Sequence, residues 1–247
     1  MINEGAMSEK TALIVPAAGI GSRFGNGGGP KKPYLLIGGR PILLRTLERF
    51  ADLPGIVQRL LVLHPDDIQR VKADWHDELA ALGVTDIVPG GATRQESVGC
   101  GLAALRSDVT IVAVHDSVRP FVSQRAIRES IQQAAAFGAA VVACRMTATV
   151  KRADSGGRIL QTVPREDLWM AQTPQTFRRE LLVRGWEAAR REGFAATDDA
   201  SLVERLGAAV VIVEESSANL KITTPADLQM AEGILHAAGA VWDDSHG

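Results

Sequence analysis

Short runs of β-prone apolar residues alternate along the chain with longer segments whose apolar positions recur at helical spacing. The strand-like runs are TALIVPA (residues 11–17), VQRLLVLH (57–64), TDIVPGG (85–91), VTIVAVHD (109–116), AAVVACRM (139–146) and AVVIVE (209–214). The helix-like segments cover residues 41–53, 65–83, 93–105, 123–138, 178–193, 197–207 and 224–239. This alternation predicts βαβ units, so we expect a Rossmann-like α/β fold with a mostly parallel sheet and helices on both faces.

The residues at the ends of these segments support the assignment. Thr93, with Glu96 three residues later, is typical of a capping box at a helix start. Gly83 stands just past another predicted helix, and Thr224 precedes the last one. The run at residues 109–116 is the most continuously apolar, which predicts a central strand covered on both faces.

Three polar or glycine-rich loops follow predicted strands. They are the loop after Val15, the stretch PGGATRQES after Val88, and HDSVRP after Val114. The carboxyl ends of parallel strands share one edge of a sheet, and ligands of α/β proteins bind there. The sequence therefore predicts one ligand site built from these three loops.

Residues 147–163 break the pattern with two alternating, exposed runs around DSGG. They predict a β-hairpin with its turn near Gly156 and Gly157. A two-stranded hairpin is marginal by itself, so we expect it to contact a second subunit. The expected organisation is one domain over residues 8–240, with a dimerisation arm at about residues 146–170.

Composition narrows the class of protein. The 247 residues are 46% hydrophobic and 23% charged, which is ordinary for a globular domain. A formal charge of −2 gives no basic field that would favour nucleic acid or an anionic membrane, and we see no apolar run long enough for a membrane span. Cys100 and Cys144 lie in apolar stretches, so we expect buried free thiols and no disulfide, which fits a reducing cytoplasm. The histidines are not spaced as in a zinc site.

The loop after Val15 combines six glycines within residues 19–29 with Arg23 and Lys32 on its two sides. Glycines let backbone N–H groups surround an anion. A P-loop requires a Ser or Thr directly after its lysine, and this loop has none. The dinucleotide fingerprint requires a third glycine, and Phe24 stands there instead, so neither motif matches. The flanking cations suit a nucleoside triphosphate, whose transfer needs positioning and charge neutralisation. A solvated loop face is the alternative.

Eight motifs resemble the 2-C-methyl-D-erythritol 4-phosphate cytidylyltransferase (IspD) family. In order they are VPAAGIGSRFG, KKPYL, GGATRQESV, HDSVRPF, TVKRA, QTPQTF, TDDASLVE and NLKITTPADL, spread from about Ala12 to Ala231. The resemblance implies that CTP and a sugar-alcohol phosphate form CDP-methylerythritol and pyrophosphate, in non-mevalonate isoprenoid synthesis. It also implies dependence on Mg²⁺ or another divalent cation, held mainly by the CTP phosphates, and a homodimer joined by an extended arm.

A phosphate oxygen is already ionised at neutral pH, so the attack needs no strong general base. The resemblance assigns the catalytic positive charges to Arg23, Lys32 and Lys221, with an exposed strand lysine as the alternative for Lys221. Small residues let backbone carbonyls accept from the cytosine amine. The resemblance assigns nucleotide binding to Pro16, Ala17, Ala18, Gly19, Gly21, Gly91, Ala92, Ser97 and Asp116.

Ala92, Arg94 and Ser97 belong to the stretch PGGATRQES, which contributes to the predicted nucleotide site. The family commonly has an acidic residue where Ala92 stands, and Arg94 is expected to order this loop. A helix-surface serine is the alternative for Ser97.

The resemblance also names residues that bind the acceptor. They are Asp116, Arg119, Thr149, Arg165, Thr173, Thr197 and Lys221, some of them presented by the arm across the dimer. The alternatives are a structural ion pair for Asp116 and Arg119, and a helix N-cap for Thr197.

Three functions compete. The motifs VPAAG and TDDAS favour the methylerythritol phosphate enzyme, whereas HDSVRP also occurs in cytidylyltransferases of the same fold that use ribitol 5-phosphate. A non-catalytic, nucleotide-binding regulator is the third, and the presence of Arg23, Lys32 and Lys221 argues against it. Product analysis with CTP and each polyol phosphate separates the three.

Overall fold

The computed structural model describes residues 9–19 and 31–243, with side chains up to residue 237. Its strands are β1 (Thr11–Ala17), β2 (Leu36–Ile37), β3 (Arg40–Pro41), β4 (Ile56–Leu63), β5 (Asp86–Pro89), β6 (Ile111–Val114), β7 (Ala139–Arg145), β8 (Val150–Ala153), β9 (Ile159–Val163), β10 (Trp169–Arg178) and β11 (Val211–Glu214). Its α-helices are α1 (Ile42–Ala51), α2 (Ile68–Asp74), α3 (His76–Ala81), α4 (Arg94–Ala103), α5 (Gln124–Phe137), α6 (Arg179–Glu192), α7 (Ala200–Glu204) and α8 (Pro225–Asp243). Two short 3₁₀ turns, η3 (Lys32–Tyr34) and η4 (Pro65–Asp67), complete the elements.

A seven-stranded sheet in the order β11-β7-β10-β6-β1-β4-β5 forms the centre of the protein. β1 pairs in parallel with both β4 and β6, and β4 pairs in parallel with β5. The chain therefore builds outward from β1 through β4 to β5, and then returns to place β6 on the other side of β1. This reversal is a topological switch point, where α/β sheets open a crevice for a ligand.

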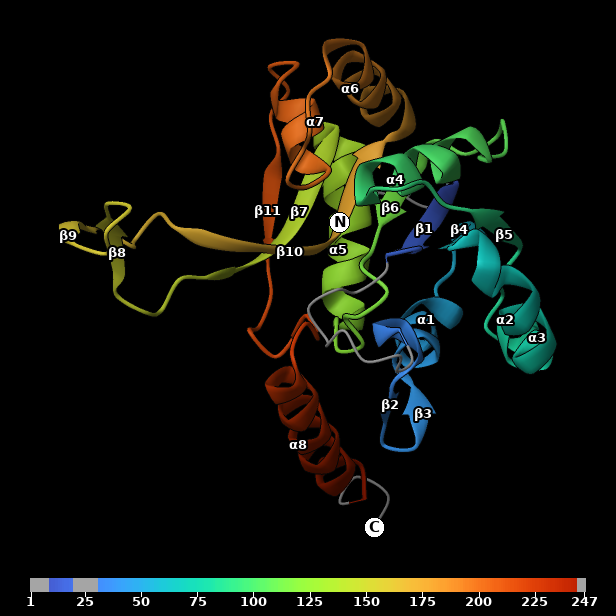
Figure 1. The fold of residues 1–247 in the computed structure, drawn as a ribbon. Coiled ribbons are helices and arrows are strands. Elements are labelled where there is room, and N and C mark those ends of the chain that lie inside the picture. Colours follow the sequence, from blue (N-terminus) through green and yellow to red (C-terminus); the bar gives the residue numbers. More distant parts are fainter. Residues whose placement is uncertain (1–8, 20–30, 244–247) are drawn as a thin grey trace, which may run out of the picture.

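Helices cover both faces of the sheet, as the sequence predicts (Figure 1). Alternate residues of β1 enter different cores: Leu13 packs with Phe50 of α1 and Ile127 of α5, whereas Ile14 packs with Val98 of α4. All four residues of β6 are fully buried, which confirms the prediction of a central, doubly covered strand.

Two parts of the fold differ from the sequence-based expectation. The segment at residues 65–83 is not one helix, since it divides into η4, α2 and α3 with a break at Trp75. β10 is antiparallel to both β6 and β7 and was not predicted from the sequence. Pro174 lies within β10, and a proline in a sequence run argues against a central strand because it cannot donate a hydrogen bond to a neighbouring strand. The register breaks around this proline, between Ala171 and Gln175.

The hairpin β8–β9 confirms the prediction of an arm. It forms a separate two-stranded sheet that stands away from the main body on the left of Figure 1. Its turn is closed by Asp154, whose carboxylate accepts from the backbone N–H groups of Gly156 and Arg158. Gly157 adopts a positive φ of 80°, which glycine tolerates at no steric cost.

Both cysteines are free, as expected: Cys144 is buried and Cys100 is half-buried. Among the described residues, no helix has both the length and the apolar character that a membrane crossing requires.

Candidate active site

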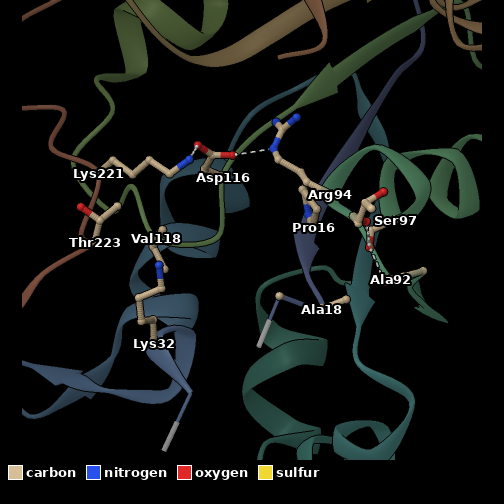
Figure 2. Close-up of a pocket in the computed structure, with 13 residues that line it drawn as sticks. Pro16, Ala18, Lys32, Ala92, Arg94, Ser97, Asp116, Val118, Lys221 and Thr223 are labelled. Carbon is tan, nitrogen blue, oxygen red and sulfur yellow. Dashed lines mark hydrogen bonds and ion pairs between the residues drawn. The ribbon is translucent and has the colours of Figure 1, made fainter. Parts of the chain in front are cut away.

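A cavity of about 360 Å³ opens at the carboxyl edge of the sheet, between the loops that follow β1, β5 and β6 (Figure 2). It is lined by Pro16, Ala18, Gly19, Lys32, Gly91, Ala92, Thr93, Arg94, Ser97, Asp116, Val118, Lys221 and Thr223. These residues come from five separate segments, and the switch point between β1 and β6 lies beneath them. The volume is in the range of small-molecule sites.

Close approach of two loops shapes one wall of this cavity. A Cβ on Gly90 would lie 2.5 Å from the Cβ of Ala18, and one on Gly91 would lie 2.4 Å from the Cβ of Glu96. Only glycine lets the loop after β5 pass this close to the loop after β1 and to helix α4. The glycines of this loop are therefore needed for packing.

The start of α4 is fixed by the predicted capping box. Thr93 Oγ1 accepts from the N–H of Glu96 at 3.1 Å, and the Glu96 carboxylate accepts from the N–H of Thr93 at 3.0 Å. Ser97 is only 2% exposed, and its hydroxyl donates to the Thr93 carbonyl at 2.9 Å. The reading of Ser97 as a surface serine is therefore wrong, since it is buried at the cavity wall.

Asp116 is the centre of charge in the cavity. Its carboxylate lies 2.7 Å from Lys221 Nζ, 3.1 Å from Arg94 Nε and 3.6 Å from Arg119 Nε. Figure 2 shows Lys221 and Arg94 reaching it from opposite sides. Burial opposes ionisation, but the charges of Arg94, Lys221 and Arg119 hold the pKa of the Asp116 carboxyl well below its usual range. Asp116 is therefore an anion held by positive charge.

Arg94 also reaches a second, more deeply buried carboxylate. Its Nη2 lies 2.8 Å from Asp199, whose side chain is 2% exposed. Burial raises the pKa of Asp199 above its ordinary value in spite of Arg94, whereas Asp199 and Asp116 together raise the pKa of Arg94 against the effect of burial. The guanidinium thus joins the cavity to the loop before α7.

A buried histidine supports the loop that carries Asp116. His115 Nε2 is 3.0 Å from the Arg119 carbonyl, and Nδ1 is 3.0 Å from Thr173 Oγ1. A carbonyl only accepts, so Nε2 carries the proton and Nδ1 accepts from Thr173. Burial lowers the pKa of His115 to about 4, which keeps the imidazole neutral in this arrangement. Thr173 in turn accepts from the N–H of Asp116 at 3.1 Å.

The structure brings most of the predicted nucleotide residues and both predicted lysines to this cavity. Lys32 and Lys221 line it together with Pro16, Ala18, Gly19, Gly91, Ala92, Ser97 and Asp116. The reading of Lys221 as a strand lysine is wrong, because Lys221 lies outside the strands and pairs with Asp116. Arg23 and Gly21 lie outside the described residues.

Other predicted residues lie elsewhere. Ala17 packs in the core beneath the cavity. Arg119 and Thr173 contact Asp116 but are not among the described residues that line the cavity. Thr149 and Arg165 are exposed on the arm. Thr197 is also exposed, and its reading as an N-cap is wrong: α7 begins at Ala200, and the carboxylate that accepts from the N–H of Ser201 belongs to Asp198.

Sequence reasoning missed three contributors to the site. Thr223 lines the cavity two residues after Lys221, His115 anchors Asp116, and Asp199 holds Arg94. His115 belongs to the motif HDSVRP and Asp199 to the motif TDDASLVE, but an Asp at a predicted helix start is usually a cap. The burial of Asp199 against Arg94 depends on the packing of α7, which periodicity does not reveal.

A magnesium ion fits this cavity only if most of its ligands come from elsewhere. Among the described residues, no group of three or more His, Cys, Asp or Glu side chains could hold a metal. Of the lining residues that the structure describes, Asp116 alone carries a carboxylate, and cations already surround it. Mg²⁺ commonly combines one or two carboxylates with substrate phosphates and water, and such an ion needs no further protein ligand here.

The fold and the site define a Rossmann-like α/β protein whose switch-point cavity is adapted to a multiply charged anion. Among the described lining residues, the cations Lys32, Arg94 and Lys221 come from separate segments, and the carboxylate is that of Asp116; Arg94 also pairs with Asp199 behind the wall. Residues 11–237 match the family model described as 2-C-methyl-D-erythritol 4-phosphate cytidylyltransferase, IspD. The chain belongs to this family.

Individual relatives agree with the family match. The 2-C-methyl-D-erythritol 4-phosphate cytidylyltransferase of Solibacter usitatus (strain Ellin6076) is 40% identical over 239 residues, covering 94% of this chain and 98% of that protein. The protein of the same name from Pelotomaculum thermopropionicum is 42% identical over 229 residues, covering 93% and 95%. The crystal structure of 4-diphosphocytidyl-2C-methyl-D-erythritolsynthase from Anaerococcus prevotii DSM 20548 is similar with a TM-score of 0.82 and 30% identity, covering 94% and 99%.

Proposed function

We propose that this chain converts CTP and 2-C-methyl-D-erythritol 4-phosphate to 4-diphosphocytidyl-2-C-methyl-D-erythritol and pyrophosphate, a step of non-mevalonate isoprenoid synthesis. The observation that carries the proposal is the convergence of Lys32, Arg94 and Lys221 on one cavity at the switch point, in a chain that matches the IspD family over residues 11–237. A protein that only sensed a nucleotide would not need positive charge on several sides of a reacting phosphate.

The proposed chemistry needs little covalent participation by the protein. A phosphate oxygen of the acceptor attacks the α-phosphorus of CTP, a new P–O bond forms, and the bond to the β-phosphate bridging oxygen breaks to release pyrophosphate. Lys32 and Lys221 stabilise the negative charge that develops on these oxygens. Asp116 holds Lys221 at 2.7 Å, so this ammonium is already in position before the substrate arrives. A Mg²⁺ ion, held mainly by the CTP phosphates, would neutralise further charge.

We place the cytosine base against the wall formed by Ala18, Gly91, Ala92 and Ser97. The Ser97 hydroxyl donates its proton to the Thr93 carbonyl, so Ser97 would meet the base only as an acceptor, alongside backbone carbonyls of the wall. A carbonyl acceptor that meets the exocyclic amine of cytosine would oppose the O4 of uracil. A hydrogen-bond mismatch of this kind discriminates strongly.

Product analysis tests the proposed function. The purified protein is incubated with CTP, Mg²⁺ and either methylerythritol phosphate or ribitol 5-phosphate, and pyrophosphate and the CDP-alcohol are quantified. We expect product with methylerythritol phosphate, a kcat/KM for UTP lower by at least about 10²-fold, and no turnover after chelation of the metal. Turnover with ribitol 5-phosphate alone would reassign the acceptor, and no turnover with either acceptor would contradict the enzyme assignment.

We further propose a homodimer in which the arm completes the neighbouring site. Ile159 and Leu160 on β9 are each 60% exposed, an apolar surface that a second copy would cover. Thr149 and Arg165 belong to the arm region and are absent from the described lining of their own chain's cavity. A partner's arm would supply Thr149 and Arg165 to the acceptor phosphate, and Thr197, which is exposed before α7, would be a further acceptor contact.

Mixing two inactive variants tests this shared site. We expect Arg165→Ala and Lys32→Ala homodimers to be nearly inactive, and their exchanged mixture to recover about a quarter of wild-type activity. About half of randomly mixed dimers are heterodimers, in which one site carries both substitutions and the other carries neither. If subunits are shown to exchange and the mixture stays inactive, Arg165 acts within its own chain.

We propose that residues 8–240 form one domain, since a single seven-stranded sheet with two flanking cores accounts for the described residues apart from the arm, the β2–β3 ribbon and the small cluster beside α8. The free thiols of Cys100 and Cys144 are consistent with a reducing cytoplasm.

A further inference from the structure

Asp67 holds two residues of the segment that contains Lys32. Its Oδ2 lies 2.7 Å from Lys31 Nζ and accepts from the Tyr34 hydroxyl at 2.9 Å. These contacts come from the residue just before Lys32 and from the residue two positions after it. One carboxylate, only 8% exposed, therefore ties down the chain on both sides of Lys32.

The segment between these contacts is itself a tight turn. In η3 the N–H of Tyr34 donates to the Lys31 carbonyl at 2.9 Å, and the N–H of Leu35 donates to the Lys32 carbonyl at 3.2 Å. Pro33 restricts the backbone directly after Lys32. A turn of this kind has few ways to move once its two ends are attached to Asp67.

The surface to which the turn is attached follows strand β4. The Tyr34 ring packs edge-on against Trp75 with 5.6 Å between ring centroids. The Arg70 guanidinium lies over the Tyr34 ring, 4.5 Å from its centroid. Arg70 also lies 3.7 Å from the second oxygen of Asp67. Because Leu63 at the end of β4 pairs with Ala17 at the end of β1, this surface stands beside the ligand cavity.

The charges of the cluster agree with this geometry. Burial would raise the pKa of the Asp67 carboxyl, but hydrogen bonds from Lys31 and Tyr34 and the charge of Arg70 lower it below its usual value. Burial and the contact with Asp67 raise the pKa of Tyr34, so its hydroxyl stays a donor. Asp67 thus accepts from both partners as an ionised group.

We propose that Asp67 is a positioning residue for nucleotidyl transfer, acting through Lys31 and Tyr34 to hold the Lys32 ammonium in the ligand cavity. This inference rests on the proposed function of the cavity. In this proposal the Asp67 cluster fixes the position of the Lys32 ammonium, in addition to the stability that a partly buried ion pair contributes. Position matters for rate because displacement of a catalytic group by about 1 Å can cost about 10²-fold.

A double-mutant cycle tests the proposal. Asp67→Asn is made in the wild type and in Lys32→Ala, and kcat and KM for CTP are measured for all four proteins. In the wild-type background we expect kcat to fall about 10- to 100-fold. In the Lys32→Ala background the same change should cost less than about twofold, because the group that Asp67 positions is already gone. Equal losses in both backgrounds would show a merely structural role and overturn the proposal.

Two further variants sharpen the cycle. Asp108→Asn is the matched control, since Asp108 pairs with Lys10 at 3.0 Å at the amino ends of β1 and β6, away from the cavity, and should leave kcat unchanged. Tyr34→Phe removes a single hydroxyl tether, and its loss should be smaller than that of Asp67→Asn. A larger loss would overturn the proposal, because Tyr34 would then act independently of Asp67.

Amide hydrogen exchange provides a readout that does not depend on activity. In Asp67→Asn, but not in Asp108→Asn, the amides of Tyr34 and Leu35 should exchange faster, since the turn is released at both ends. Unchanged exchange would overturn the proposal even if activity fell. Absence of turnover in the wild type would instead contradict the proposed function, and the exchange measurement would still decide whether Asp67 holds the turn.

Discussion

Replacing Lys221 by alanine is expected to lower kcat by about 10²- to 10³-fold, or about 3–4 kcal/mol of barrier. The Lys221 ammonium is held 2.7 Å from Asp116 at the cavity wall, so it needs no rearrangement when charge develops on the substrate. An interaction made mainly in the transition state lowers kcat when it is removed, with a smaller effect on KM. Steady-state kinetics with CTP and methylerythritol phosphate measure both parameters.

The fold of this variant should survive. Asp116 keeps Arg94 at 3.1 Å and Arg119 at 3.6 Å, so its buried carboxylate stays paired. Lys221→Met is the matched companion, since it keeps most of the aliphatic length and removes only the charge. The free energy of unfolding of both variants should lie within about 1 kcal/mol of the wild-type value, because the lysine side chain is partly exposed. Turnover close to that of the wild type in both would exclude Lys221 from the mechanism.

Local sequence signals were enough to predict the parallel part of the fold. β1, β4, β6 and β7 are apolar runs between helices with recognisable ends, and their burial on both sheet faces confirms that interpretation. Thr93 and Glu96 form the capping box that their spacing predicts. The rule that ligands bind at strand carboxyl ends then placed the cavity without knowledge of any contact.

The rest depends on contacts between segments far apart in the chain. β10 contains Pro174 and takes its direction from β6 and β7, so neither composition nor periodicity identifies it as a central strand. Asp67 and Lys31 are separated by 36 residues, and Asp199 and Arg94 by more than 100. A single sequence gives no reason to pair these charges, because an isolated Asp near a helix start is usually a cap or solvated.

The largest stability effect is expected at Arg94. Its side chain pairs with Asp199 at 2.8 Å, and the Asp199 side chain is only 2% exposed. Arg94→Ala leaves this carboxylate buried without its cation, a change that typically costs about 3–5 kcal/mol of folding free energy. Asp116 is less affected, since Lys221 and Arg119 remain beside it. Urea unfolding at pH 7 measures the loss.

The source of this loss can be isolated by removing the second charge and by changing the pH. Asp199→Asn added to Arg94→Ala should recover most of the lost stability, because the buried charge is then absent. The pKa of Asp199 is already raised by burial in the wild type, and it rises further without Arg94. A raised native pKa means that the folded state binds the proton more tightly, so the penalty is complete above that pKa and is relieved as the pH falls through it towards the ordinary value of about 3.9. Relative to the wild type, Arg94→Ala should therefore regain stability on acidification, whereas the double variant should not. A loss that is independent of pH and persists in the double variant would place the effect in lost packing instead of in the charge of Asp199.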